Sequence, residues 1–304
     1  MKRPWPMQEI QVQDMGVDEE SSKTSLTSIV VGLQVNGEEQ WLVDAASRIA
    51  VALKAQLILV HVIESPDGRM VRTDMEYLDR DLARARQMLR DYARQLPDSV
   101  SVTTTVLRGD NPSGYLAAPE LFGSSLMLIV GSSSPLHEWL PKGASVIQDL
   151  LSHLTLPLLV IRQAKERQFA KKPLRLLIAD DLTDSFEIVL KSLVRIFGNV
   201  PNLEVYHIHI SEPSLGGADR SLSQVNLRQR WHKASNGSPL ETCPYKAEVY
   251  SSEPIQGLLQ VEALYDVDVF IMSKKSQVSD QNLREPIPLG RILSKAKSLL
   301  VIGE

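Results

Sequence analysis

The chain has 304 residues, of which 33 are Lys or Arg and 37 are Asp or Glu, and its formal net charge is −4. This length predicts two domains of roughly 150 residues each, and the acidic balance excludes the strongly basic surface that nucleic-acid binding proteins carry. No stretch reaches the roughly 18 consecutive apolar residues of a membrane-spanning helix, and the single cysteine, Cys243, excludes an internal disulfide. We therefore expect a cytoplasmic protein without nucleic-acid or membrane partners.

The first predicted unit is a strand followed by a helix. Residues 1–25 contain no apolar run of signal-peptide length and are expected to form a flexible tail. Residues 28–33 are short, apolar and β-branched, which is typical of a strand covered on both faces. Apolar residues between positions 41 and 53 then recur at helical spacing, and Asn36 and Glu39 have the spacing of a capping box before that helix.

The rest of the first half continues the alternation of strands and helices. The predicted strands are residues 56–62, a strand ending near 107, residues 125–130 and residues 156–161; the predicted helices are residues 74–96, a short helix after Pro112, and a helix from about Gly143. Strands that alternate with helices imply right-handed crossovers and a doubly wound, mainly parallel sheet.

The same order of patterns returns at an offset of roughly 141 to 148 residues, which indicates an internal repeat. His209 to Glu212 falls where His61 to Glu64 stands in the first half, and both halves end on Leu-Leu-Val-Ile, at 158–161 and 299–302. The predicted organisation is a tail at 1–25, a first domain at 26–163, a polar linker at 164–173 and a second domain at 174–304.

In a doubly wound sheet, ligands bind beyond the carboxyl ends of the strands, where the strand order reverses. The loop after the fourth strand is expected to begin at Gly131, and the following helix near Gly143. Small residues let a ligand approach the backbone, and the free N–H groups of a helix start attract phosphate oxygens. Glycine and serine are also common in ordinary turns, so a turn without a ligand stays open as an interpretation.

These residues resemble the signature of nucleotide-binding universal stress proteins, which is a glycine, two residues, a second glycine, nine residues, and glycine followed by serine or threonine. Gly131 matches the first glycine and Ser134 stands at the second. Gly143 arrives one residue early and is followed by Ala144 and Ser145. The family aspartate at the end of strand one is represented by Gln34 in the first half and by Asp181 in the second.

The resemblance implies an α/β fold with two tandem Rossmann-like domains of the adenine nucleotide alpha-hydrolase-like type, each with a five-stranded parallel sheet of order 3-2-1-4-5 and helices on both faces. It also implies that the last strands of the two domains pair edge to edge. The implied ligand is ATP or another adenine nucleotide, and whether magnesium accompanies it stays open. The implied first site comprises Gln34, Val62, Gly131, Ser132, Ser134, Gly143 and Ser145, and a second, degenerate site comprises Asp181, Ile210, Ser273 and Gly290.

Three functions remain open at this point. The first is a stress-response protein that binds a nucleotide and acts through conformation or assembly; the second is a scaffold with degenerate sites that acts by protein interaction or homodimerisation. The third is a slow ATPase or nucleotidyl transferase, for which no general base is evident. No GxSxG, Walker, HExxH or Rossmann glycine motif occurs, so no catalytic residue is predicted. His61 and His209 are expected to be packed, hydrogen-bonded residues rather than metal ligands.

Overall fold

Ten strands form one sheet with helices on both faces in the computed structural model, which describes residues 27–34, 37–64, 72–109, 111–118, 121–132, 146–153, 155–163, 173–182, 186–211, 217–273 and 298–302. In the first half the elements are β1 (Ser28–Gly32), α1 (Gln40–Leu53), β2 (Gln56–Glu64), α2 (Arg72–Arg94), β3 (Val102–Gly109), α3 (Pro112–Ala117), β4 (Ser125–Ser132), α4 (Val146–His153) and β5 (Leu158–Arg162). In the second half they are β6 (Leu174–Ala179), α5 (Phe186–Phe197), β7 (Leu203–Ser211), α6 (Gly217–Ser235), β8 (Tyr245–Ser251), α7 (Pro254–Tyr265), β9 (Val269–Ser273) and β10 (Ser298–Ile302).

The order of the strands is β3-β2-β1-β4-β5-β10-β9-β6-β7-β8. Every pair within a half is parallel, and each half therefore has the expected order 3-2-1-4-5. The halves meet at β5 and β10, which pair antiparallel with Leu300 opposite Leu159 and Leu299 opposite Val160. The expected edge-to-edge pairing of the last strands is thus confirmed, and it removes two sheet edges from solvent.

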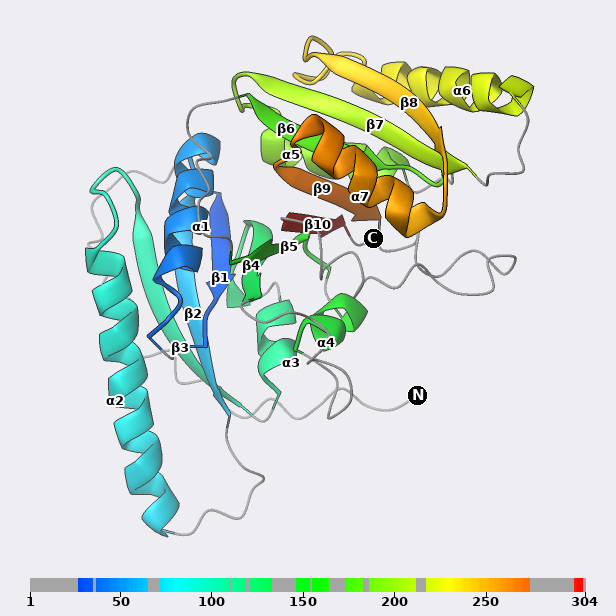
Figure 1. Ribbon diagram of the computed structural model, residues 1–304. Coiled ribbons are helices and arrows are strands. Elements are labelled where there is room, and N and C mark those ends of the chain that lie inside the picture. Colours follow the sequence, from blue (N-terminus) through cyan, green and yellow to red (C-terminus); the bar gives the residue numbers. More distant parts are fainter. Residues whose placement is uncertain are drawn as a thin grey trace.

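The helices divide between the two faces of the sheet (Figure 1). One apolar cluster joins the sheet to α1, α2, α5 and α6 through side chains such as Leu42, Leu89, Leu190 and Trp231. A second cluster, on the opposite face, joins it to α3, α4 and α7. A sheet that buries both faces explains why its strands are apolar runs without polar alternation.

Two short helices begin as the sequence predicts, with proline in the first turn. The side chain of Asn111 accepts a hydrogen bond from the Gly114 amide at 3.0 Å before α3. Glu253 accepts one from the Gln256 amide at 2.8 Å before α7. A proline at this position loses nothing, because the first amides of a helix have no partner within it.

The predicted capping box before α1 is wrong for Glu39. The helix starts at Gln40, so Glu39 is itself the N-cap residue and makes no capping bond with its side chain. Its carboxylate instead accepts a hydrogen bond from the Gln34 amide at 2.6 Å. The other member of the predicted box, Asn36, lies outside the described residues. The carboxylate therefore holds the chain that leaves β1 rather than the helix that follows.

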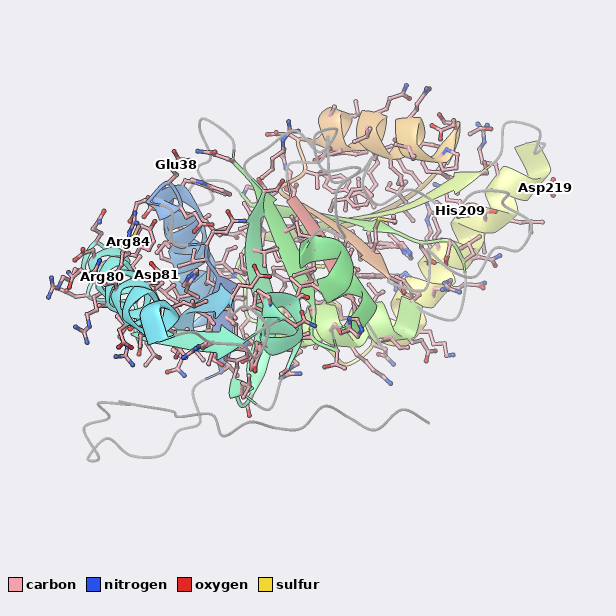
Figure 2. The ribbon with its side chains drawn as sticks, turned by 90° about the horizontal axis from the view of Figure 1, so that it is seen from below. Glu38, Arg80, Asp81, Arg84, His209 and Asp219 are labelled. Atoms are coloured by element: carbon pink, nitrogen blue, oxygen red, sulfur yellow. The ribbon has the colours of Figure 1, made fainter. Side chains whose placement is uncertain are left out.

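Exposed charged side chains lie on α2 at one end of the molecule and on α6 at the other. Figure 2 shows Arg80, Asp81 and Arg84 projecting from α2 at one end, and Asp219 on α6 at the other. All four side chains are exposed, so they are suited to serve as surface controls for variants of buried groups. Among the described residues, no helix is both long and apolar enough to cross a bilayer.

Candidate functional site

The carboxyl ends of β1, β2 and β4 meet at one edge of the sheet, because β1 lies between the other two strands and pairs in parallel with both. Gln34 follows β1 and is exposed, and Val62 lies near the end of β2. Gly131 and Ser132 end β4. The structure thus brings four of the seven residues of the predicted first site to one edge. The other three, Ser134, Gly143 and Ser145, lie outside the described residues.

Gly131 and Ser132 belong to a strand, which corrects the prediction that the loop begins at Gly131. Their pairing with Ile161 and Arg162 extends β4 by two residues. A Cβ atom on Gly131 would lie 2.9 Å from Leu42 Cδ2 and 3.1 Å from the Trp41 ring. Glycine at this position therefore lets α1 pack closely against the sheet.

Ser132 lies on the opposite face of the strand from Gly131, since successive side chains of a strand alternate. Its side chain is buried, and its Oγ has no hydrogen-bond partner among the described residues. A buried hydroxyl without a partner costs free energy. The end of β4 therefore holds a polar group that a ligand or a neighbouring loop could satisfy.

The second half repeats this arrangement at the opposite end of the sheet. β6 lies between β7 and β9, Asp181 follows β6, Ile210 lies near the end of β7, and Ser273 ends β9. Ser273 is the last residue of β9 and is buried. Gly290 lies outside the described residues. Three of the four residues predicted for this site therefore share one edge.

A histidine makes the same hydrogen bond in each half. His61 Nδ1 lies 2.8 Å from the carbonyl oxygen of Leu33, and His209 Nδ1 lies 2.8 Å from that of Asp180. Both are the packed, hydrogen-bonded residues that the sequence indicates. The shared bond also shows that Asp180 occupies the place of Leu33, and that Asp181 occupies the place of Gln34.

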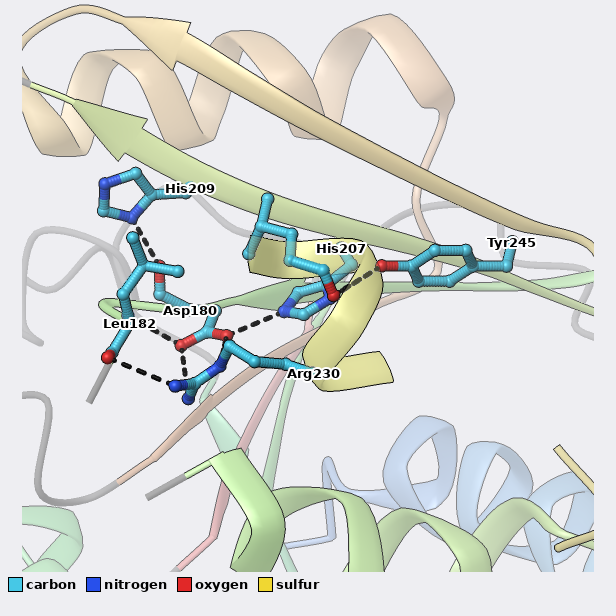
Figure 3. Close-up of polar contacts among 7 residues, drawn as sticks. Asp180, Leu182, His207, His209, Arg230 and Tyr245 are labelled. Atoms are coloured by element: carbon cyan, nitrogen blue, oxygen red, sulfur yellow. Dashed lines mark hydrogen bonds and ion pairs between the residues drawn. The ribbon is translucent and has the colours of Figure 1, made fainter. Parts of the chain in front are cut away.

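Asp180 forms the centre of a buried polar network (Figure 3). Its Oδ2 accepts hydrogen bonds from His207 Nε2 at 2.9 Å and Arg230 Nε at 3.0 Å. Its Oδ1 accepts from the Leu182 amide at 2.8 Å and Arg230 Nη2 at 3.3 Å. The carboxylate side chain is only 2% exposed and His207 is fully buried. The network therefore fills a position that an apolar side chain occupies in the first half.

Aromatic rings surround this network on the α5 and α6 face. Phe186 stacks on His207 with 4.5 Å between centroids, and the Arg230 guanidinium lies 5.2 Å from the centroid of the Phe186 ring. Trp231 stacks on Tyr245, whose hydroxyl lies 3.0 Å from His207 Nδ1. These contacts restrict the orientation of each side chain in the network.

Burial lowers the pKa of His207, although the hydrogen bond to Asp180 acts in the opposite direction. The imidazole is therefore neutral near pH 7. Because a carboxylate oxygen accepts hydrogen bonds, we assign the imidazole proton to Nε2, which leaves Nδ1 as an acceptor facing the Tyr245 hydroxyl. That hydroxyl has one proton, which it also directs to the Leu227 carbonyl oxygen at 3.2 Å. The arrangement has the order carboxylate, imidazole, hydroxyl, but complete burial of the imidazole keeps it away from any substrate.

We expect acid to destabilise the protein through His207. An unfolded histidine titrates near about pH 6.5, and the folded pKa is lower, so below that pH the unfolded chain binds more protons than the folded one. The free energy of unfolding should therefore fall as the pH drops below about 6.5. Urea titrations between pH 7.5 and 5 would measure this slope.

The control for the acid slope is His207→Leu. The variant should show a shallower slope over the same pH window, because it lacks the buried imidazole. An unchanged slope would contradict the assignment to His207.

Sequence reasoning did not identify this network. Asp180 follows β6, Arg230 lies on α6 and Tyr245 begins β8, and no spacing along the chain connects the three residues. One signal was available, namely a carboxylate at the strand end where the first half has Leu33. Among the described residues, no group of three or more His, Cys, Asp or Glu side chains could hold a metal ion.

Comparisons with known proteins agree with the fold. The sequence profile of the Universal stress protein family matches residues 26–162. A search of curated proteins finds no match. A universal stress protein from Archaeoglobus fulgidus DSM 4304 is similar in structure, with a TM-score of 0.65, 14% identity, and coverage of 91% of this chain and 98% of its own. A protein of unknown function from Pseudomonas aeruginosa PAO1 has a TM-score of 0.57, 15% identity, and coverage of 92% of this chain and 93% of its own.

Proposed function

We propose that the chain is a tandem universal stress protein that binds an adenine nucleotide in the crevices at its strand ends, because the profile of the Universal stress protein family matches residues 26–162. In this proposal the first domain is residues 26–163, the linker 164–173 and the second domain 174–304. The identical strand order of the two halves and the repeated bond from histidine to a carbonyl support the division.

The observation that carries the ligand proposal is the reversal of strand order at β1 and at β6. The chain passes from each of these strands to a neighbour on one side (β2 or β7), and a later crossover adds a strand on the other side (β4 or β9). A crevice therefore opens beyond the carboxyl end of β1 and of β6. A residue able to hydrogen-bond a ribose follows each strand, namely Gln34 and Asp181. In the first site the proposed ligand contacts are Gln34, Val62, Gly131, Ser132, Ser134, Gly143 and Ser145; in the second they are Asp181, Ile210, Ser273 and Gly290.

ATP, with or without magnesium, is the proposed ligand, and the protein responds to it through conformation or assembly in the cytoplasm. The buried hydroxyl of Ser132, which has no hydrogen-bond partner in the described part of the chain, supports a polar ligand near the end of β4. The β5–β10 seam gives a ligand-induced shift in one half a direct path to the other, since β10 pairs with both β5 and β9.

The test has two steps. The purified protein is first extracted with acid, and any co-purified nucleotide is identified by mass spectrometry. ATP with magnesium is then titrated into the full chain by calorimetry. Asp181→Ala should weaken binding to the second half about tenfold or more, because it removes a charged acceptor. Gln34→Ala should weaken the first half less, since a neutral amide is lost.

The matched control is Asp219→Ala, an exposed aspartate on α6, which should leave binding unchanged. Absence of both co-purified nucleotide and binding heat would contradict the proposal. The scaffold function would then be favoured, and protein partners would be sought.

A further inference from the structure

The turn that follows β6 has an unusual backbone. Leu182 has a φ of +65°, in the left-handed region. That region disfavours a branched, bulky side chain such as leucine, at a cost of about 1 kcal/mol or more. A non-glycine residue keeps this conformation only when its surroundings impose it. The residue immediately before it is Asp181, the proposed ligand contact of the second half.

Two side chains hold this turn from opposite ends of Leu182 (Figure 3). Asp180 Oδ1 accepts a hydrogen bond from the Leu182 amide at 2.8 Å. Arg230 Nη1 donates to the Leu182 carbonyl oxygen at 3.2 Å. Both peptide groups that flank the strained torsion are therefore fixed. Arg230 comes from α6, so the turn is fastened to a rigid helix on one face of the sheet.

His207 fixes the carboxylate itself. Its Nε2 donates to Asp180 Oδ2, to which Arg230 Nε also donates, and the imidazole is stacked on Phe186 with an interplanar angle of 8°. Each Asp180 oxygen thus receives two hydrogen bonds, and the carboxylate has no freedom to rotate. We call Asp180, His207 and Arg230 the Asp180 clamp.

The first half shows that the fold does not require these polar groups. Leu33 occupies the place of Asp180 and Leu59 the place of His207, and both are buried in the apolar core. The strand pairing and the bond from histidine to a carbonyl are nevertheless the same. Buried charged groups do not stabilise a core more than well-packed apolar groups do. Stability alone therefore does not account for the clamp.

We propose that the Asp180 clamp is a positioning device, which holds the turn Asp180–Leu182 in its strained conformation and thereby presents Asp181 and the neighbouring backbone to the ligand of the second half. The inference rests on the proposed nucleotide function for its ligand, but its effect on the turn is independent of that function. The clamp thereby gives the second half a turn whose conformation is fixed before the ligand binds.

The principal variant, which we call the swap, gives Asp180 and His207 the leucines of the first half and replaces Arg230 by an uncharged side chain: Asp180→Leu, His207→Leu and Arg230→Met together. Since the swap removes all three polar partners at once, it leaves no unpaired buried charge and should keep the thermal unfolding midpoint near that of the unaltered protein. ATP affinity of the second half, titrated by calorimetry with magnesium present, should fall about tenfold or more.

A double-mutant cycle with Asp181→Ala separates positioning from a merely structural role. If the clamp acts through Asp181, adding Asp181→Ala to the swap should cause little further loss of affinity, so the two effects are not additive. Full additivity, or an affinity that the swap leaves unchanged, would overturn the proposal. The single variant Arg230→Lys should retain part of the affinity that the swap loses, because lysine keeps the positive charge but lacks the planar guanidinium that contacts both Asp180 oxygens. The control Lys233→Met, an exposed cation on the same helix, should change nothing.

Amide hydrogen exchange supplies a readout that needs no nucleotide. The Leu182 amide donates to Asp180, so its exchange should be slow in the unaltered protein and at least about tenfold faster in the swap. Unchanged exchange would overturn the clamp even if the protein binds ATP. If the unaltered protein binds no ATP, the proposed function and the ligand-presenting role fail together, and exchange still decides whether the clamp fixes the turn.

Discussion

Asp180→Ala is expected to lower the free energy of unfolding by about 3–5 kcal/mol, the usual cost of removing one partner from a buried ion pair. The carboxylate is 2% exposed and accepts hydrogen bonds from three different residues. Removing it leaves the Arg230 guanidinium, itself only 24% exposed, without its anion, and leaves His207 Nε2 without an acceptor. The strained Leu182 turn also loses one of its two fastenings. Urea unfolding followed by circular dichroism would measure the difference.

The matched control for this loss is Asp219→Ala. The Asp219 side chain is exposed on α6 (Figure 2), so its removal should change the free energy of unfolding by less than about 0.5 kcal/mol. A comparably small loss in Asp180→Ala would show that the network is solvated in solution. It would also remove the physical basis for treating the clamp as rigid.

The α/β class and the internal repeat could be predicted from the sequence, because they depend on patterns that single elements display, such as apolar runs, proline before a helix, or a repeated Leu-Leu-Val-Ile. The strand order and the β5–β10 pairing could be expected only through the resemblance to universal stress proteins. The ends of elements were less well predicted. Gly131 and Ser132 are turn-forming residue types, yet pairing with β5 keeps them in the strand. Tertiary pairing outweighed local preference at that position.

The Asp180 clamp could not be predicted, because its members are distant in the chain. His207 and Asp180 are 27 residues apart, and Arg230 and Asp180 are 50 apart. Their contact depends on how α6 packs over β7, which no local pattern encodes. The repeat contained a partial signal, since an acidic residue in the second half replaces an apolar residue of the first. A residue that differs between the two halves is informative because the strand pairing and the bond from histidine to a carbonyl at that position are the same in both.

The second large effect is expected from a substitution in the antiparallel β5–β10 pair, which is the seam between the two halves. Leu300 on β10 is fully buried and lies opposite Leu159 on β5, while the same strand pairs with β9 on its other side. Leu300→Asp would place a carboxylate in the apolar core without a partner. We expect a loss of about 5 kcal/mol or more in the free energy of unfolding, the sum of a large-to-small core change and the burial of a charge.

This loss should reach both halves at once, because the sheet is continuous through β10. The chain has four tryptophans, Trp5, Trp41, Trp139 and Trp231. Two single-tryptophan variants, which keep only Trp41 or only Trp231 and carry phenylalanine at the other three positions, would report the unfolding of the first and of the second half separately. We expect the two transitions to coincide and both to be shifted by Leu300→Asp. The control Val51→Asp should shift neither transition, because Val51 on α1 is 53% exposed. If Leu300→Asp shifted only the transition reported by Trp231, the halves would be separate folding units, and a ligand in one could not act on the other through the seam.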